Sequence, residues 1–376
     1  RQRQMCIRDS HSYIVMKGRL LVPHMDPAIA RRTLVAGLPV ALISSCLAGC
    51  RSQRQSAVRE SSSSSHGNLS APAAMRLPQG WTWVAGSDIP VAKATLRLPV
   101  TTTDGTGRRV TIKNANRIIV GGEDVADILA ALGWRKLIYA APTNSVAEAA
   151  VNAPKHYGFS KKTGMEGLLS IDGTLFIGNN PMRHGRAAAK FREAGVDAAV
   201  VNDRQPIGGK IRAVATFLGD PKAGDKLAGA VERQLAEAAA ITRARQGHRL
   251  RILAVTASGA GGANAVMGMG TASAEMIAAC GATSVGVRAG LRGYSVKFTD
   301  EGLLSMKPDV ILTGDGDLKR WGGLEGYLKA FPTLAQTPAG RKNHVFVMPS
   351  EQIKVSGVGV GAGAIALACA LDALSR

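Results

Sequence analysis

A five-residue segment occurs twice in the chain, and this duplication limits the folds that the chain can adopt. Glu166-Gly167-Leu168-Leu169-Ser170 recurs as Glu301-Gly302-Leu303-Leu304-Ser305. The flanking residues repeat the same pattern, which predicts a short helix, a turn, and an apolar strand that ends in Gly and polar residues. Because the copies are domain-sized and few, we predict two similar lobes and not a solenoid of short repeats.

Strands alternate with helices on both sides of this repeat, which predicts an α/β fold with a central parallel sheet in each lobe. Residues 100–112 predict a β-hairpin around Asp104-Gly105. Residues 225–246 predict one long helix that joins two Rossmann-like lobes as a rigid strut. The other predicted strands are 117–121, 136–141, 174–178, 198–202, 251–256, 310–313 and 345–348, and the other predicted helices are 124–132, 183–194, 272–280 and 362–374.

The start of the chain has the pattern of an export signal. A basic pair, Arg31-Arg32, precedes an apolar stretch over 33–47, which is too short to span a membrane. The stretch ends in Leu47-Ala48-Gly49-Cys50, which resembles a lipobox, so we expect Cys50 to carry lipid as the first mature residue. Residues upstream of Met25 do not fit this design, and we interpret them as an artefactual start.

These patterns predict an order of domains along the chain. The signal and lipobox take residues 1–50, and a Ser-rich flexible tether takes 51–94. The N-terminal lobe follows over 95–209, connecting helices over 210–249, and the C-terminal lobe over 250–376.

Charge and cysteine usage narrow the possible functions. The formal net charge of +20 suits an anionic ligand, an anionic membrane surface or nucleic acid. However, the sequence contains no nucleic-acid-binding motif, so we expect no nucleic acid partner. The cysteines lack metal-site spacing, and Cys280 and Cys369 lie in apolar helical runs, which indicates structural thiols. No nucleophile–base pair or phosphate loop is evident, so we expect a protein that is not an enzyme.

Several segments resemble helical-backbone substrate-binding proteins, the class III fold that serves ABC importers of iron siderophores, cobalamin and heme. Residues 98–112 and 116–133 look like the start of that family, and residues 266–287 and 324–348 look closest to its hemin-binding branch. The resemblance covers about residues 95–376. It implies a monomer without a catalytic cofactor, and the lipobox at Cys50 implies a lipid anchor on the outer face of the cytoplasmic membrane. Its partners would be a heme ligand and an ABC permease with its ATPase. Ferric siderophore or cobalamin are alternative ligands, and a surface lipoprotein without a transport role is the other class left open.

The resemblance also implies roles for the duplicated glutamates. In this family each lobe offers a surface glutamate to arginines of the permease, and the matching positions are Glu166 and Glu301. A carboxylate that faces a guanidinium forms a charge-assisted pair, and two such pairs would fix the docking orientation. The alternative is that both glutamates only start a helix, where negative charge is favourable.

The iron ligand of the hemin-binding branch is missing from its usual place. The branch carries a tyrosine or histidine ahead of the lobe-one glutamate, and here Phe159 stands there, which can stack on a porphyrin but not bind iron. The repeat maps Phe159 onto Tyr294, so we predict that the two rings face each other across the ligand cleft and that Tyr294 binds the metal. The other candidate contacts are Tyr157, Met267 and Met269, with Arg183, His184 and Arg292 for ligand carboxylates.

Overall fold

The computed structural model describes residues 70–72, 76–158, 164–243, 250–259 and 262–374, which all lie in one compact unit over residues 63–376. The predicted signal, Cys50 and Phe159 lie outside the described residues. Within the described ranges, no helix combines the length and the apolar character that crossing a bilayer requires.

The first lobe is a five-stranded parallel sheet in the order β6-β5-β4-β7-β8, which confirms the parallel sheet expected there. Its strands are β4 (Ile118–Val120), β5 (Ile138–Pro142), β6 (Lys155–Tyr157), β7 (Leu175–Gly178) and β8 (Asp197–Val200). Its helices are α1 (Glu123–Ala131), α2 (Glu148–Val151), α3 (Gly164–Leu169), α4 (Pro181–Glu193) and α5 (Ile207–Phe217). The predicted hairpin is present as β2 (Val100–Thr103) and β3 (Arg109–Ile112).

The side chains of the central strands point alternately to the two faces of this sheet and are apolar on both, which explains why helices cover both faces. Ile118 and Val120 of β4 pack in one core with α1 and α5, whereas Ile119 between them packs in a second core with α3 and α4. Successive side chains of a strand point to opposite faces, so a strand that is apolar throughout must be covered on both sides.

The second lobe is a seven-stranded sheet in which β11 pairs with β9 beside the path β1-β14-β13-β9-β10-β12. Its strands are β1 (Trp81–Trp83), β9 (Arg251–Thr256), β10 (Ala265–Met267), β11 (Thr283–Ser284), β12 (Tyr294–Ser295), β13 (Val310–Gly314) and β14 (Val345–Met348). Its helices are α7 (Ala272–Ala279), α8 (Val285–Arg288), α9 (Asp300–Met306), α10 (Asp315–Arg320), α11 (Leu324–Ala330), α12 (Pro338–Arg341), α13 (Ser350–Lys354) and α14 (Gly359–Ala373). The strand β10 runs antiparallel to both of its neighbours, β9 and β12, so the sheet is parallel only in part.

The strand β1 was not predicted, because we assigned residues 51–94, which include Trp81–Trp83, to the flexible tether. The strand instead pairs in parallel with β14 and forms the edge of the second-lobe sheet. The Trp81 ring packs edge-on against Tyr327, with the ring centroids 5.3 Å apart. A three-residue strand is too short to give a periodic signal in the sequence, so only its long-range pairing reveals it.

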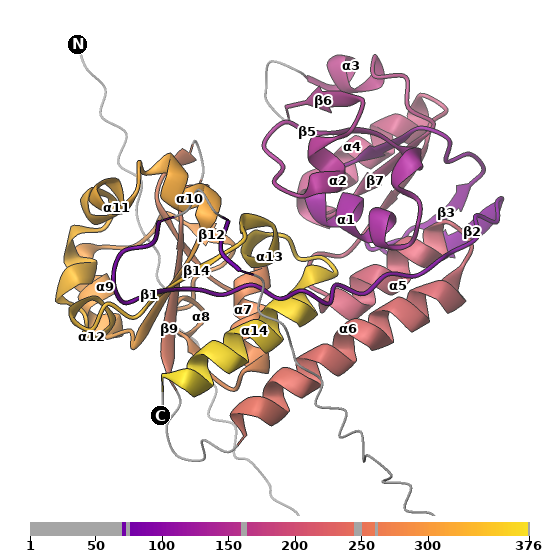
Figure 1. Ribbon diagram of the computed structural model, residues 1–376. Helices are drawn as coiled ribbons and strands as arrows, with labels where there is room; N and C mark the ends of the chain where they lie inside the picture. Colours follow the sequence, from indigo (N-terminus) through magenta and orange to yellow (C-terminus); the bar gives the residue numbers. More distant parts are fainter. Residues whose placement is uncertain (1–69, 73–75, 159–163, 244–249, 260–261, 375–376) are drawn as a thin grey trace, which may run out of the picture. The chain divides into compact units, whose positions relative to one another are not determined.

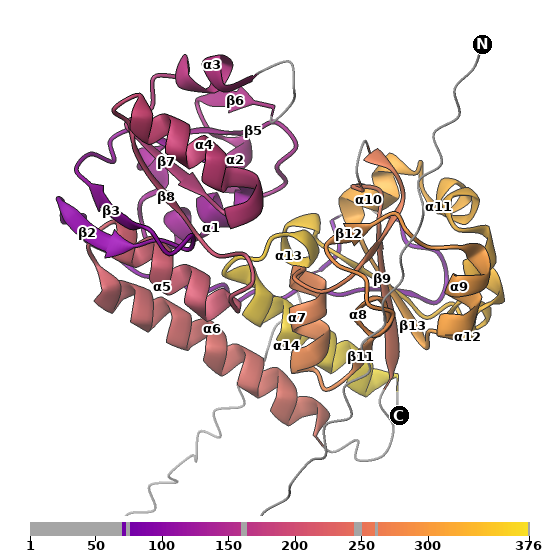
Figure 2. The ribbon, with the colours of Figure 1, turned by 180° about the vertical axis from the view of Figure 1, so that it is seen from behind.

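The predicted connecting helix is α6 (Pro221–Thr242), which packs against α5 and against α14 (Figures 1 and 2). Its 22 residues give a length of about 33 Å. The helix begins earlier than expected because Asp220 caps it and Pro221 takes the first helical position. The terminal helix α14 is buried along most of its length, which its apolar sequence predicts.

Three carboxylates join the two lobes by accepting backbone hydrogen bonds. Asp127 of α1 accepts from the N–H of Val358 at 2.7 Å, and Glu351 of α13 accepts from the N–H of Glu148 at 3.0 Å. Glu275 of α7 accepts from the N–H of Ile207 at 3.1 Å. Two of these donors, at Glu148 and Ile207, are in first helical turns, where N–H groups lack partners within the helix.

Replacing Asp220 with Ala should lower the stability of the chain. The Asp220 carboxylate accepts from Ala223 N at the start of α6 and from Thr95 N in the preceding segment, so Ala would leave both donors without a partner. We expect a loss of about 1–2 kcal/mol in the free energy of unfolding, measured by urea titration. Asp220→Asn, which keeps a capping oxygen, should lose less. Equal losses in the two variants would contradict the capping role.

Candidate functional site

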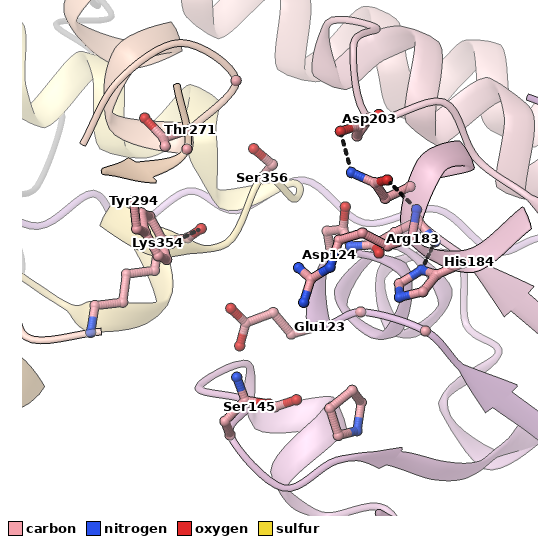
Figure 3. Close-up of a pocket in the computed structure, with 18 of the residues that line it drawn as sticks. Glu123, Asp124, Ser145, Arg183, His184, Asp203, Thr271, Tyr294, Lys354 and Ser356 are labelled. Carbon is pink, nitrogen blue, oxygen red and sulfur yellow. Dashed lines mark hydrogen bonds between the residues drawn. The ribbon is translucent and has the colours of Figure 1, made fainter. Parts of the chain in front are cut away.

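A cavity of about 540 Å³ is lined by residues of both lobes, which is within the usual size range of ligand pockets (Figure 3). Each strand of the first-lobe sheet ends at this cavity. The lining residues that follow these strands are Gly121 and Gly122 after β4, Asn144 and Ser145 after β5, Gly158 after β6, Asn179 after β7 and Asp203 after β8. The carboxyl edge of a parallel sheet is the common place for a ligand in such folds.

Glycine at the end of β4 allows the chain to pass close to β7. A Cβ atom on Gly121 would lie 2.8 Å from the Gly178 Cα atom, and one on Gly122 would lie 2.0 Å from the Asn179 amide nitrogen. Gly122 is also the residue that precedes α1, so α1 starts at the wall of the cavity. The close approach brings the first turn of α1 next to the polar residues after β7.

An acidic side chain is buried at this turn and is paired with a lysine. The Asn179 side-chain amide donates to Asp124 Oδ1 at 2.7 Å, and Lys210 Nζ of α5 lies 3.9 Å from Asp124 Oδ2. Both charged side chains are less than a tenth exposed. Burial raises the pKa of Asp124, whereas Lys210 opposes that shift. A buried pair of this kind tolerates the loss of neither partner.

Glu123, the neighbour of Asp124, extends toward the middle of the cavity (Figure 3). Its carboxylate accepts a hydrogen bond from the backbone N–H of Val146, which ties the loop after β5 to α1. Burial raises the pKa of Glu123, and nearby Asp124 adds to this shift.

The start of α4 presents His184 and Arg183 to the cavity. Asn180 caps the helix by accepting from Arg183 N at 2.9 Å, and its amide donates to Asp203 at 2.6 Å. His184 Nδ1 accepts from the backbone N–H of Asn179 at 3.1 Å, so the neutral ring carries its proton on Nε2. Burial lowers the pKa of His184 to about 4, with Arg183 contributing, so the ring is neutral at pH 7. The Arg183 side chain points into the cavity (Figure 3).

The second lobe contributes a lysine and a tyrosine. Lys354 Nζ donates to Asp317 Oδ1 at 2.7 Å and to Ser258 Oγ at 3.0 Å, and both members of the ion pair are buried. The Tyr294 hydroxyl donates to the backbone carbonyl of Lys354 at 3.2 Å. Burial raises the pKa of Tyr294, and the nearby carboxylate of Glu123 adds to this shift.

Some of the residues predicted to contact the ligand line the cavity, and others do not. Tyr294 and Arg183 line the cavity, as does Gly158, the described residue next to Phe159. Tyr157 is buried in the first lobe, with its hydroxyl bonded to the Val120 carbonyl.

The remaining candidates lie away from the lining. Met267 is fully buried in β10, and Met269 and Arg292, both exposed, share an isolated β-bridge. Glu166 and Glu301 are exposed in the first turns of α3 and α9, which form the two copies of the duplicated segment. These site assignments therefore remain predictions.

Several lining residues were missed in the sequence. Most of them follow a strand or lie in the first turn of a helix, whereas Lys354 and Ser356 lie at the end of α13. The missed residues are Glu123, Asp124, Ser145, Asn179, Asn180, Asp203, Lys210, Thr271, Lys354 and Ser356. Polar residues after β7 were visible as Asn179-Asn180, but nothing in the sequence marked Lys210 or Lys354 as their neighbours. Within the described ranges, no group of three or more His, Cys, Asp and Glu side chains could hold a metal ion.

Comparisons with known proteins agree with this geometry. The family model described as periplasmic binding protein matches residues 118–352, more than half of the chain. The search of curated proteins gives no match.

Among solved structures, the periplasmic heme-binding protein RhuT from Roseiflexus sp. RS-1 is 29% identical, with 70% of this chain and 100% of that chain covered and a TM-score of 0.60. The periplasmic heme-binding protein BhuT, solved in complex with two hemes, is 27% identical, with 69% and 99% covered and a TM-score of 0.56. The heme-binding protein HmuT is 24% identical, with 78% and 97% covered and a TM-score of 0.65, and this likeness concerns the fold.

The family match and the two α/β lobes agree on the class III fold. The family consists of exported proteins that bind a ligand and pass it to an ABC permease, which is a binding role and not a catalytic one. The chain belongs to the periplasmic binding protein family.

Proposed function

We propose that the chain captures heme in the cavity between its lobes and delivers it to an ABC permease with its ATPase. The observation that carries this proposal is that most charged side chains around the cavity already have a partner in the protein, whereas Arg183 has no ion-pair partner among the described residues. Asp124 is paired with Lys210, Asp203 accepts from Asn180, and Lys354 is paired with Asp317.

Arg183 differs from the other cavity cations. Among the described residues, no carboxylate lies within ion-pair distance of its guanidinium, although its side chain points into the cavity (Figure 3). A guanidinium in such a position favours an anionic ligand group, because it can pair with a carboxylate through two parallel hydrogen bonds. Heme carries two carboxylates on a flat apolar ring. The similarity to the Roseiflexus protein, which is a heme-binding protein, supports the same choice.

Tyr294 is the residue that we propose as the iron ligand. Its hydroxyl faces the second-lobe wall and donates to the Lys354 carbonyl, so iron binding would replace this proton. A tyrosine oxygen is an established axial ligand of heme iron. The raised pKa of Tyr294 means that the phenolate forms only when the metal supplies the compensating charge.

A ferric siderophore is the second candidate ligand, with cobalamin as a further member of the same class. The observation that favours a siderophore is Phe159, which has no donor atom at the position where the hemin-binding branch carries an iron ligand. A siderophore arrives with its iron already saturated, so it would need Arg183 and aromatic contacts but no metal ligand from the protein.

Two further roles complete the proposal. Glu166 and Glu301 are exposed near the starts of equivalent helices and away from the cavity lining, which suits docking to arginines of the permease. Cys50 would carry the lipid that holds the protein at the outer face of the cytoplasmic membrane.

Replacing Tyr294 with Phe should remove the tyrosinate-to-iron charge-transfer band when the purified protein is titrated with hemin. Tyr327→Phe is the matched control, because the buried Tyr327 hydroxyl has no hydrogen-bond partner among the described residues and lies outside the cavity.

Arg183→Gln should weaken hemin binding about tenfold, since it removes one charge-assisted hydrogen-bond pair. A parent protein that ignores hemin but binds a ferric siderophore tightly would overturn the heme assignment.

Reversing the charge of both glutamates, as Glu166→Lys with Glu301→Lys, should abolish uptake of ligand by cells and leave ligand affinity unchanged. The two side chains are exposed and remote from the cavity, so the variant should fold normally. Uptake is measured with a labelled ligand and affinity by titration. A collapse of affinity would instead place these residues in the binding site.

Replacing Cys50 with Ser should release the protein from the membrane fraction, because serine has no thiol for lipid attachment. Immunoblots of membrane and soluble fractions measure the distribution. Serine in place of Cys46, which lies earlier in the same apolar region, serves as the control and should leave the protein on the membrane. Unchanged membrane retention of the Cys50→Ser variant would rule out the anchor.

A further inference from the structure

The first lobe has a second hollow, of about 710 Å³, outside the cavity already described. The turn between β2 and β3 forms one side of it, and the exposed face of α4 forms the other. Residues 182, 185, 189 and 192 of α4 line it at helical spacing, whereas His184, Ala187, Ala188 and Phe191 turn the other face of the helix into the core.

Three arginines lie around this hollow: Arg108 from the turn, and Arg186 and Arg192 from α4. Among the residues that the structure describes, no acidic side chain lines it. Four of the other lining residues, Gly105, Gly107, Gly185 and Ala189, have no long side chain, so a ligand can approach the guanidinium groups without obstruction.

Arg192 is fixed in place by the fold. Its Nη1 atom donates to the Ala198 carbonyl at 2.9 Å and lies 4.0 Å from Asp104 Oδ2. Asp104 already accepts hydrogen bonds from Thr106 N at 2.9 Å, from the Thr106 hydroxyl, from Val200 N at 3.2 Å and from Arg108 N at 3.3 Å. Because this carboxylate holds the turn together, it offsets the charge of the arginines only in part.

Arg108 and Arg192 repel each other across the hollow. Burial lowers the pKa of Arg192, and the positive charge of Arg108 lowers it further. Neither Arg108 nor Arg186 has an ion-pair partner within the described ranges. The cluster therefore carries an unfavourable concentration of like charge that an anion would relieve.

We propose that this hollow binds a phosphate group, either as free phosphate or as the headgroup of an anionic phospholipid. Three arginines that line one hollow suit a tetrahedral group with several acceptor oxygens better than a planar carboxylate, which one guanidinium can satisfy. Met182, 86% exposed, also lines the hollow, and its apolar side chain suits the acyl chains below a lipid headgroup.

Titration calorimetry with two probes tests this site and identifies the source of the phosphate. The probes are inorganic phosphate and a short-chain phosphatidylglycerol below its micelle concentration. The test variant is Arg108→Gln with Arg186→Gln, which leaves the structural Arg192 in place. The control is Arg233→Gln with Arg243→Gln, which removes the same charge from exposed positions at α6.

We expect the parent and the control to bind at least one probe, and the test variant to bind it about tenfold more weakly. Binding of phosphatidylglycerol alone would identify a lipid headgroup, whereas binding of both probes would identify the phosphate group itself. The proposal is overturned if the parent binds neither probe, or if the control loses as much affinity as the test variant. Circular dichroism spectra confirm that the variants fold, and hemin titration is unaffected in either case because the hollow lies outside the ligand cavity.

Discussion

Close packing of α6 against α5 and α14 is the contact on which the arrangement of the molecule depends. A Cβ atom on Gly224 of α6 would lie 2.5 Å from the Ala215 Cβ atom of α5, and one on Gly361 of α14 would lie 2.5 Å from Gln234 of α6. Such approaches require small residues, because the distance between packed helices is set by the side chains at the contact. The abundance of Gly and Ala in the sequence therefore reflects a structural need.

The three carboxylates that accept backbone hydrogen bonds between the lobes also help to fix how one lobe is oriented on the other. Asp127, Glu275 and Glu351 each bind a single N–H group of the other lobe, so they fix orientation more than they add stability. Burial raises the pKa of Asp127 to about 7, which lies far above that of an exposed aspartate. The folded state therefore holds the Asp127 proton more tightly than the unfolded state, and this contribution to stability is lost as the pH rises through about 7.

Local patterns in the sequence predicted most of the fold, whereas the site depended on contacts that no local pattern contains. The strands β9 and β14 lie where the sequence predicted strands at 251–256 and 345–348. The pair of Asp124 with Lys210, by contrast, joins α1 to α5, and Lys354 reaches Asp317 from another helix. Such convergence follows from the order of strands in the sheets, which no local stretch of sequence reveals. Glu166 and Glu301 could be singled out because the segment that contains them occurs twice. Glu123 lies in no repeated segment, so nothing in the sequence marked it as a cavity residue.

The pairing of β1 with β14 has a consequence for the order in which the molecule is assembled. Trp81–Trp83 and Val345–Met348 lie near opposite ends of the chain, yet they form neighbouring strands. The first-lobe sheet is made from one continuous stretch of chain, so it can form as soon as that stretch is available. The strands β9 to β14 also come from one continuous stretch, but β1 joins β14 only when a long loop closes, and until then the edge of β14 is unpaired. The second-lobe sheet is therefore complete only after two segments far apart in the sequence have met, whereas the first-lobe sheet needs no such meeting.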